Sequence, residues 1–452
     1  MAPSEKRKKI ALFSHGGVKN LGDEALFATV LQNTRLRIPD AEIVGFTSNP
    51  EDTKQRHGLE TFPIRRLDPE PATAPSKESA AARSSAPQVS TPAPTGLRKM
   101  LKGVPGLAAS IRGGRVLGHV LKSVVLEPKF LYDSYRRLKG ADLLIATGGQ
   151  QLNDGYGGPW GFPFTLYKWT LLAKCTGTKV VFPSLGAGPI DSPLSKFFFR
   201  RTLNLVSYRS YRDAISSKLM AGMGIKGEHP VFPDLVYSLR LPAPKRPPSG
   251  AERVVVGANP VPFYAPHYWP TPDQARYEEY VRKLARFVEW LDKSGHAVSL
   301  FPTQTRADVI TIDHIRASMN GSASSPNILP PPQMQNLEDL VTEISRADLI
   351  VANRYHGILI SLMMNKPVLG IAYHEKSRAL LEQAGMGDYV LNIGNFKIEE
   401  LIERFKDMEA NAPMLKKRIA QRMDPLRKAL EGQYDTVFGL IGIKPATAAK
   451  AD

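Results

Sequence analysis

Residues 347–376 read ADLIVANRYHGILISLMMNKPVLGIAYHEK, and this stretch decides the predicted fold. Residues 348–352 form a short apolar run rich in β-formers, residues 358–364 are apolar at helical spacing, and residues 368–373 form a second apolar run. Short apolar runs on either side of a helical segment indicate a β-α-β unit. In a right-handed unit the two strands are parallel, so their carboxyl ends open on the same side.

Three basic side chains leave the carboxyl ends of these two strands. Arg354 and His356 follow the first strand, and Lys376 follows the second. Open α/β sheets bind ligands at this edge, and the amino end of a helix favours an anion. We therefore expect the three side chains to converge on an anion. The alternative is that Arg354 and Lys376 pair with surface carboxylates and that His356 caps a helix.

The chain of 452 residues lacks the apolar length that a bilayer span needs. Its basic N-terminus is followed by an apolar run too short for a signal peptide, so a cytoplasmic location is expected. The single cysteine, Cys175, excludes an internal disulfide and offers no metal cluster. Because Cys175 lies in an apolar helical stretch, it is predicted to be a core residue.

The charge balance is basic, with 60 Lys and Arg against 43 Asp and Glu. Such an excess suits nucleic acid, anionic lipid or small anionic substrates. The sequence shows no helix-turn-helix pattern, zinc spacing or aromatic RNA-binding motif, so nucleic acid is not expected as a partner. Residues 97–126 are basic and apolar but broken by glycine and proline. They are expected either to lie on an anionic membrane surface or to form a mobile insertion.

The two halves of the chain resemble each other. Residues 141–146, ADLLIA, correspond to residues 347–352, ADLIVA, and a polar loop, a helix and another strand follow each run. We expect two Rossmann-like, doubly wound α/β domains that face each other across a cleft. The predicted parts are an N-terminal domain at 1–241 with a disordered and basic insertion at 68–126, a linker at 242–250, a C-terminal domain at 251–430, and a helix and tail at 431–452.

Further polar and glycine-rich segments follow strands of the predicted N-terminal domain. Glycines let the backbone approach a ligand, and the acidic helix start at Asp23 suits a sugar better than a phosphate. The glycine spacing is not that of a nucleotide fingerprint. Turn formation, helix capping or a surface ion pair would be the structural alternatives. The candidates are Asn20, Asp23, Gly148, Gly149, Asp154, Gly186, Gly188 and Arg212.

Several of these segments together resemble the polysaccharide pyruvyl transferase family. The specific part is Arg354-Tyr355-His356-Gly357 with Lys376 twenty residues after the histidine. The supporting parts are residues 20–25, Gly148-Gly149, residues 186–189 and Arg212-Asp213. The resemblance covers most of the chain apart from 68–126 and the extreme C-terminus. One departure is Gln150, where the family often has a third glycine, and a side chain there is expected to narrow the cleft.

The resemblance implies a glycosyltransferase-B-like fold, with phosphoenolpyruvate as donor and a sugar of a cell-surface glycan or exopolysaccharide, free or lipid-linked, as acceptor. It implies a pyruvate ketal as product, an N-terminal acceptor side and a C-terminal donor side. The enzyme would work at the inner face of the membrane and require no metal or other cofactor. A nucleotide-sugar glycosyltransferase and a non-catalytic glycan or membrane assembly factor are the alternatives.

Roles for the candidate residues follow from this chemistry. His356 is expected to be the general acid, because an imidazole can be protonated near neutral pH. Arg354 would bind carboxylate or phosphate bidentately, and Lys376 would balance the charge of the departing phosphate. Arg212 would be a second clamp from the N-terminal domain. Asn20, Asp23 and Asp154 would orient the sugar.

Overall fold

A computed structural model of the protein describes residues 7–16, 20–66, 127–241, 253–269, 271–319 and 324–445. The predicted insertion at 68–126 and the predicted linker at 242–250 therefore lie outside the described residues, as does the proposed membrane contact of 97–126. None of the helices within the described ranges combines the length and the apolar character that crossing a membrane requires.

The N-terminal sheet has seven parallel strands in the order β3-β2-β1-β4-β6, and β5 and β7 both pair with β6. Its strands are β1 (Lys9–Phe13), β2 (Glu42–Thr47), β3 (Glu60–Pro63), β4 (Leu143–Ala146), β5 (Gly149–Leu152), β6 (Lys179–Ala187) and β7 (Tyr208–Tyr211). Its helices are α1 (Leu21–Arg37), α2 (Pro50–His57), α6 (Phe162–Cys175), α7 (Pro193–Leu205), α8 (Ala214–Gly222) and the 3₁₀ helix η1 (Leu235–Ser238).

The C-terminal sheet has five parallel strands in the order β12-β11-β10-β8-β9. The strands are β8 (Val255–Asn259), β9 (Ala297–Leu300), β10 (Leu349–Ala352), β11 (Val368–Ala372) and β12 (Val390–Asn392). The helices are α9 (Gln274–Lys293), α10 (Ala307–Ala317), α11 (Leu337–Arg346), α12 (Tyr355–Met363), α13 (Glu375–Gln383), the 3₁₀ helix η3 (Gly387–Tyr389), α14 (Ile398–Ala410) and α15 (Ala412–Gly439).

Both sheets reverse their strand order once, between β1 and β4 in one and between β8 and β10 in the other. Ligands of open α/β sheets bind outside the carboxyl ends of the strands at such a reversal. The start of α1 follows β1, and the start of α12 follows β10. The backbone amide of Leu21 donates to the carbonyl of Thr303 at 3.0 Å, so the two carboxyl edges approach each other.

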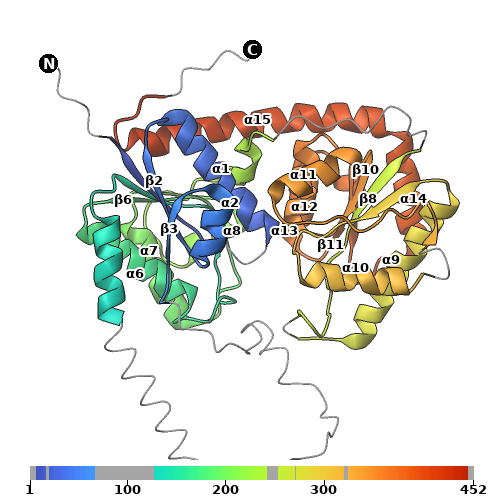
Figure 1. Ribbon diagram of the computed structural model, residues 1–452, viewed down its shortest axis with the longest axis horizontal. Helices are drawn as coiled ribbons and strands as arrows, with labels where there is room; N and C mark the ends of the chain where they lie inside the picture. The colour runs from blue at the N-terminus through green and yellow to red at the C-terminus, as the bar shows by residue number, and fades with distance from the viewer. Residues whose placement is uncertain are drawn as a thin grey trace, which may run out of the picture.

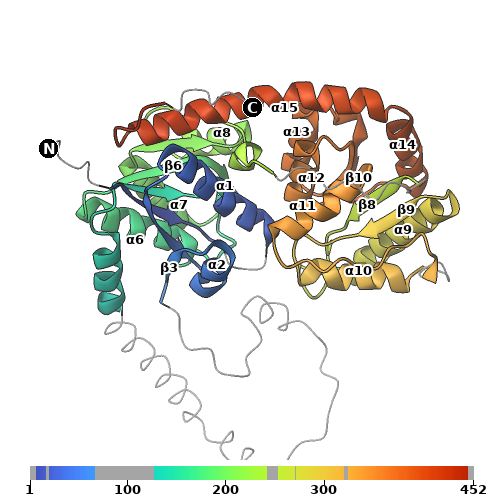
Figure 2. The same cartoon turned by 45° about the horizontal axis from the view of Figure 1, so that its top comes forward.

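The long helix α15 connects the two halves (Figures 1 and 2). It begins at Ala412 beside the C-terminal sheet, well before residue 431, where the sequence prediction begins the last segment. Its Arg427 donates to the carbonyl of Met363 at 3.3 Å. Further along, the Gln433 amide donates to Ser184 of β6 at 3.0 Å. One helix thus packs on both domains and holds them side by side.

The structure confirms two doubly wound domains, and it corrects two local predictions. The glycine segments predicted as loops continue the sheet: β5 begins at Gly149, and β6 runs through to Ala187. Strand pairing between Gly149 and Leu185 overrides the local turn signal of the glycines. Cys175 is exposed, because the last turn of α6 places it away from the sheet. The domain boundaries themselves stay a prediction.

Candidate active site

Lys376 reaches from the first turn of α13 across to the N-terminal domain. Its Nζ donates to the Gln150 side-chain oxygen Oε1 at 2.5 Å and to the backbone carbonyl of Ala187 at 2.9 Å. The side chain is buried. Burial, followed by repulsion from the nearby Arg212 guanidinium, lowers the pKa of Lys376 to about 8. The ammonium group thus has neutral oxygen acceptors from the other domain.

Arg212 follows β7 and meets the same oxygen. Its Nη2 donates to Gln150 Oε1 at 2.8 Å, and its Nη1 donates to Asp234 Oδ2 at 3.1 Å. The Tyr355 ring stacks on the guanidinium, 4.7 Å from ring centroid to Cζ. Burial opposes the charge, but these neighbours raise the pKa of Arg212 above its ordinary value. The guanidinium is therefore permanently charged although only 6% of its side chain is exposed.

His356 lies in the first turn of α12, against the start of α1. A Cβ on Gly22 would be 2.1 Å from His356 Nδ1, so only glycine leaves room for the imidazole. Among the described residues, Nε2 has no hydrogen-bond partner, and it is buried. Burial lowers the pKa of His356, Arg212 lowers it further, and Asp234 and Asp23 act in the opposite direction. The lowered pKa favours the neutral imidazole at pH 7.

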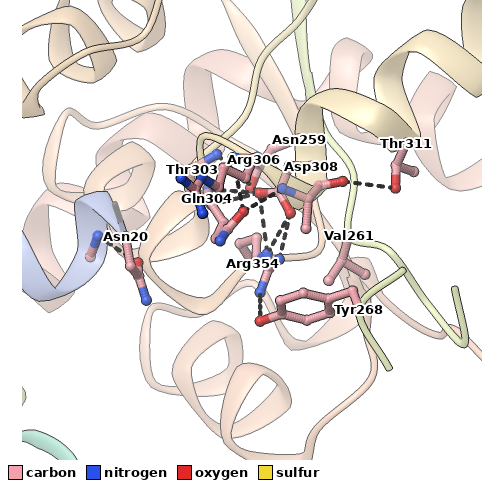
Figure 3. Close-up of polar contacts among 12 residues, drawn as sticks. Asn20, Asn259, Val261, Tyr268, Thr303, Gln304, Arg306, Asp308, Thr311 and Arg354 are labelled. Atoms are coloured by element: carbon pink, nitrogen blue, oxygen red, sulfur yellow. Dashed lines mark hydrogen bonds and ion pairs between the residues drawn. The ribbon is translucent and has the colours of Figure 1, made fainter. Parts of the chain in front are cut away.

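Arg354 points into a different environment (Figure 3). Its Nε donates to both oxygens of Asp308, at 3.1 and 3.3 Å, and its Nη2 donates to Asp308 as well. Its Nη1 meets the Tyr268 hydroxyl at 3.4 Å. Burial opposes the charge of Arg354, but Asp308 raises its pKa well above the ordinary value. The fully buried Asp308 also accepts from the backbone amides of Thr303 and Gln304, at 3.1 and 2.8 Å.

The charged residues thus form two groups. The interdomain cluster consists of Gln150, Arg212, Asp234, His356 and Lys376. The C-terminal cluster consists of Tyr268, Asp308 and Arg354. The expected convergence of Arg354, His356 and Lys376 is therefore corrected. Arg354 contacts Asp308, and Arg212 of the N-terminal domain shares an oxygen with Lys376 instead.

Two of the residues predicted to orient a sugar are engaged with the backbone. The Asn20 side chain accepts from the amide of Gly22 at 3.0 Å and caps α1. Asp154 Oδ2 accepts from the amides of Asp191 and Ser192, at 2.7 and 2.8 Å. Asn20 fits the capping alternative, whereas Asp154 holds the segment that precedes α7, whose N-cap is Ser192. Asp23 differs, because it lines a small cavity beside Gln150.

The predicted glycines surround the interdomain cluster without facing it as a row of amides. A Cβ on Gly186 would be 2.7 Å from both Arg212 Nε and Gln150 Oε1, so glycine admits these two side chains. The carbonyl of Gly188 accepts a hydrogen bond from the Gln150 amide. Gly148 and Gly149 lead into β5, which carries Gln150. The glycines therefore position the cluster.

A groove of about 930 Å³ opens between the domains, lined by Glu24, Arg56, Arg306 and Leu337 among others. It does not include the interdomain cluster. A cavity of about 20 Å³, lined by Asn20, Asp23 and Glu24 among others, borders the groove, and a cavity of about 10 Å³ beside Gln150 shares Asp23 with it.

Sequence reasoning missed Asp234 and Asp308 and noticed Gln150 only as a departure from a family pattern. Asp234 follows a proline in an irregular segment, and Asp308 lies in the first turn of an ordinary helix. Neither position carries a local signal, because the partners, Arg212 and Arg354, are 22 and 46 residues away.

The comparisons with known proteins agree on family and fold. A family model described as polysaccharide pyruvyl transferase matches residues 20–375. No protein of curated function matches the chain in sequence. The UDP-GlcNAc 2-epimerase of Neisseria meningitidis bound to UDP-GlcNAc is similar with a TM-score of 0.52 at 12% identity, over 96% of this chain and 100% of that chain.

Two further epimerase structures show the same likeness. That of Methanocaldococcus jannaschii has a TM-score of 0.51 at 10% identity, over 89% of this chain and 92% of that chain. A putative UDP-N-acetylglucosamine 2-epimerase of Listeria monocytogenes has a TM-score of 0.51 at 10% identity, over 95% and 97%. At these identities the likeness concerns the fold alone, and it confirms the predicted glycosyltransferase-B-like arrangement.

Proposed function

The chain belongs to the polysaccharide pyruvyl transferase family, and from this premise we propose that it is a phosphoenolpyruvate-dependent, ketal-forming enzyme. It transfers the enolpyruvyl group to a sugar of a cell-surface polysaccharide or exopolysaccharide, or of its lipid-linked precursor. Phosphate is released. The reaction takes place in the cytoplasm, at the inner face of the membrane, and needs no metal or other cofactor.

One observation carries the proposal. Two cations, Arg212 and Lys376, come from different domains and meet at one oxygen, beside the imidazole of His356. A compact polyanion such as phosphoenolpyruvate requires clustered cations and no pocket for a nucleotide base. Arginine and lysine donors bind carboxylate and phosphate oxygens strongly through charge-assisted hydrogen bonds.

The reaction proceeds by proton transfer and two oxygen additions. His356 gives a proton to the methylene carbon of the enol, and a sugar hydroxyl adds to the adjacent carbon and releases its proton. The bond from that carbon to the phosphate oxygen breaks, and the phosphate leaves with the bonding electrons. A second sugar hydroxyl then adds to the same carbon and releases a proton, which closes the ketal.

The lowered pKa of His356 couples protonation to donor binding. In the free protein, burial keeps the imidazole neutral at pH 7. The negative charges of the bound donor would raise its pKa, because an anion nearby favours the charged form. His356 would thus become an acid when the donor is in place.

Arg354 has a narrower role than the one expected from the sequence. Asp308 occupies its Nε and Nη2, which leaves Nη1 near Tyr268 for a single substrate oxygen. Asp308 is then the residue that positions the guanidinium. The donor site lies between the domains, because Gln150 and Arg212 come from the N-terminal one.

We place the sugar acceptor at the groove and the two small cavities beside it. The groove and the small cavity lined by Asn20 and Asp23 share Glu24 and Arg56, and Asp23 also lines the small cavity beside Gln150. Asp23 lines both small cavities and is the best placed acid to orient a sugar hydroxyl there. Asn20 and Asp154 support this side through their backbone contacts.

Ligand-dependent thermal unfolding tests the proposal on the full chain. Phosphoenolpyruvate and a panel of nucleotide sugars are compared at equal ionic strength, with the wild type and Lys376→Met. A ligand at a hundred times its dissociation constant stabilises a folded protein by about 2.7 kcal/mol. We expect stabilisation by phosphoenolpyruvate that Lys376→Met greatly reduces.

Two other outcomes would overturn the proposal. A response to nucleotide sugars alone would identify a glycosyltransferase of the same architecture. A response to neither ligand class would favour a non-catalytic assembly factor. Mass spectrometry of 4-nitrophenyl hexosides incubated with the enzyme and phosphoenolpyruvate then identifies which sugar gains a pyruvate ketal.

A further inference from the structure

The Gln150 side-chain oxygen has an unusual set of partners. It accepts from Lys376 Nζ at 2.5 Å and from Arg212 Nη2 at 2.8 Å. Both donors are cationic, whereas the acceptor is a neutral amide. The second acceptor of the ammonium group, the carbonyl of Ala187, is neutral as well. A cationic donor already strengthens its hydrogen bond to a neutral oxygen, and an anionic oxygen would add Coulomb attraction to both cations, so an anion would suit this position better.

The amide is held in place from its other end. Its Nε2 donates to the carbonyl of Gly188, and the absence of a Cβ at Gly186 makes room for Oε1. The adjacent cavity of about 10 Å³ has space for roughly one water molecule. A phosphate or carboxylate group therefore cannot reach the two cations while Gln150 occupies this position.

We propose that the Gln150 amide oxygen occupies an oxyanion subsite between Arg212 and Lys376, and that a phosphate or carboxylate group displaces it on binding. The subsite itself rests on the two cations, and only the assignment of the oxyanion to phosphoenolpyruvate rests on the proposed function. Gln150 acts as an internal competitor. Its oxygen accepts hydrogen bonds from both cations in the free protein and so lowers the affinity for an oxyanion at this position.

Calorimetric titration with inorganic phosphate and with phosphoenolpyruvate at pH 7 tests this subsite. Gln150→Ala removes the competing oxygen, and we expect about tenfold tighter phosphate binding, equivalent to one net hydrogen bond. Gln150→Glu fixes a carboxylate between the cations, and we expect at least about tenfold weaker binding. Gln32→Ala is the matched control, because the Gln32 side chain hydrogen-bonds the backbone of Arg240, which lies outside the cluster.

A second measurement covers the case in which a variant changes the fold. Burial lowers the pKa of Lys376 to about 8. The carboxylate of Gln150→Glu should move the lysine pKa upward, as measured by NMR of its side chain. An unmoved lysine pKa in a folded Gln150→Glu variant would place the residue outside the subsite.

The outcomes separate this inference from the proposed function. Tighter phosphate binding by Gln150→Ala, in a protein that does not bind phosphoenolpyruvate, would leave the subsite standing and overturn pyruvyl transfer. Unchanged or weaker phosphate binding by Gln150→Ala, in a protein whose wild type binds phosphoenolpyruvate, would overturn the subsite and keep the function.

Discussion

The interdomain cluster and the C-terminal cluster each receive a side chain from the segment that follows β10. The two clusters differ in the hydrogen-bond acceptors that their cations meet. Arg354 and His356 are two residues apart, yet the guanidinium enters the C-terminal cluster and the imidazole enters the interdomain one. In the C-terminal cluster Arg354 meets a fully buried carboxylate. In the interdomain cluster Lys376 donates to two neutral oxygens, and Arg212 shares one of them while it also pairs with the buried carboxylate of Asp234.

The difference is clearest for Lys376, whose two acceptors are neutral oxygens, and we propose that this cation is the one most available to a ligand. Removing one partner of a buried ion pair leaves an uncompensated charge and costs about 3–5 kcal/mol. A substrate has no means of displacing Asp308 at that cost. Displacing a neutral amide oxygen with an anionic one is favourable by comparison. Three variants and one pH titration test whether the C-terminal cluster stabilises the fold and the interdomain cluster binds the ligand.

The largest effect is expected for His356→Ala in the interdomain cluster. Loss of the general acid should lower turnover by about 10²–10⁴-fold, measured as ketal formation from phosphoenolpyruvate. Donor affinity and thermal stability should stay close to the wild type. His314→Ala is the control, since that imidazole contacts Tyr277 and lies outside the interdomain cluster. Near-normal turnover of His356→Ala would remove the histidine from catalysis.

In the C-terminal cluster, Asp308→Ala should act on stability instead. It leaves the buried Arg354 without its carboxylate, and we expect the free energy of unfolding to fall by about 3–5 kcal/mol. Chemical denaturation measures this loss. Asp313→Ala, an exposed aspartate on the same helix, should cost little. If Asp308→Ala were as stable as the wild type, the proposed division between the clusters would be wrong.

Gly22→Ala tests the position of the His356 imidazole while leaving the residue in the protein. The added Cβ would overlap His356 Nδ1 and push the ring away. A displacement of about 1 Å can lower turnover by about 10²-fold. Gly432→Ala is a suitable control, because a Cβ there meets nothing within 4 Å. Turnover is again the measurement, and equal rates for both variants would contradict the close contact.

The smallest effect is a pH dependence of donor binding. Only protonated Lys376 is a cation, so affinity for phosphoenolpyruvate should fall as the pH rises through about 8, by at most about tenfold per pH unit. The second pKa of a phosphate ester is about 6, so above about pH 7.5 the donor is almost fully ionised, and titrations from there to pH 10 report mainly the lysine. Lys376→Arg should flatten the profile. A midpoint near 10 would indicate an exposed, ordinary lysine.

Much of the fold was predictable because it depends on local periodicity. The β-α-β unit of residues 347–376 formed as β10, α12 and β11, with its basic residues at the carboxyl edge. The glycine segment at 148–149 was misread, because pairing with β6 draws the chain into a strand. Cys175 was misplaced because apolar neighbours in a helix do not determine which side its last turn faces.

The basic residues of the candidate site could be singled out from the sequence, but their hydrogen-bond partners could not. Apolar spacing and chain order place Arg354, His356 and Lys376 at one sheet edge. They do so because side chains repeat with a fixed period along strands and helices, and this period identifies the elements from the sequence. Whether a cation meets Asp308 or Gln150 depends on how two domains and their loops fit together. Those contacts join positions up to 226 residues apart, and no local pattern encodes them. Tertiary packing alone decided which acceptor each cation meets, because that choice depends on how the two domains fit together.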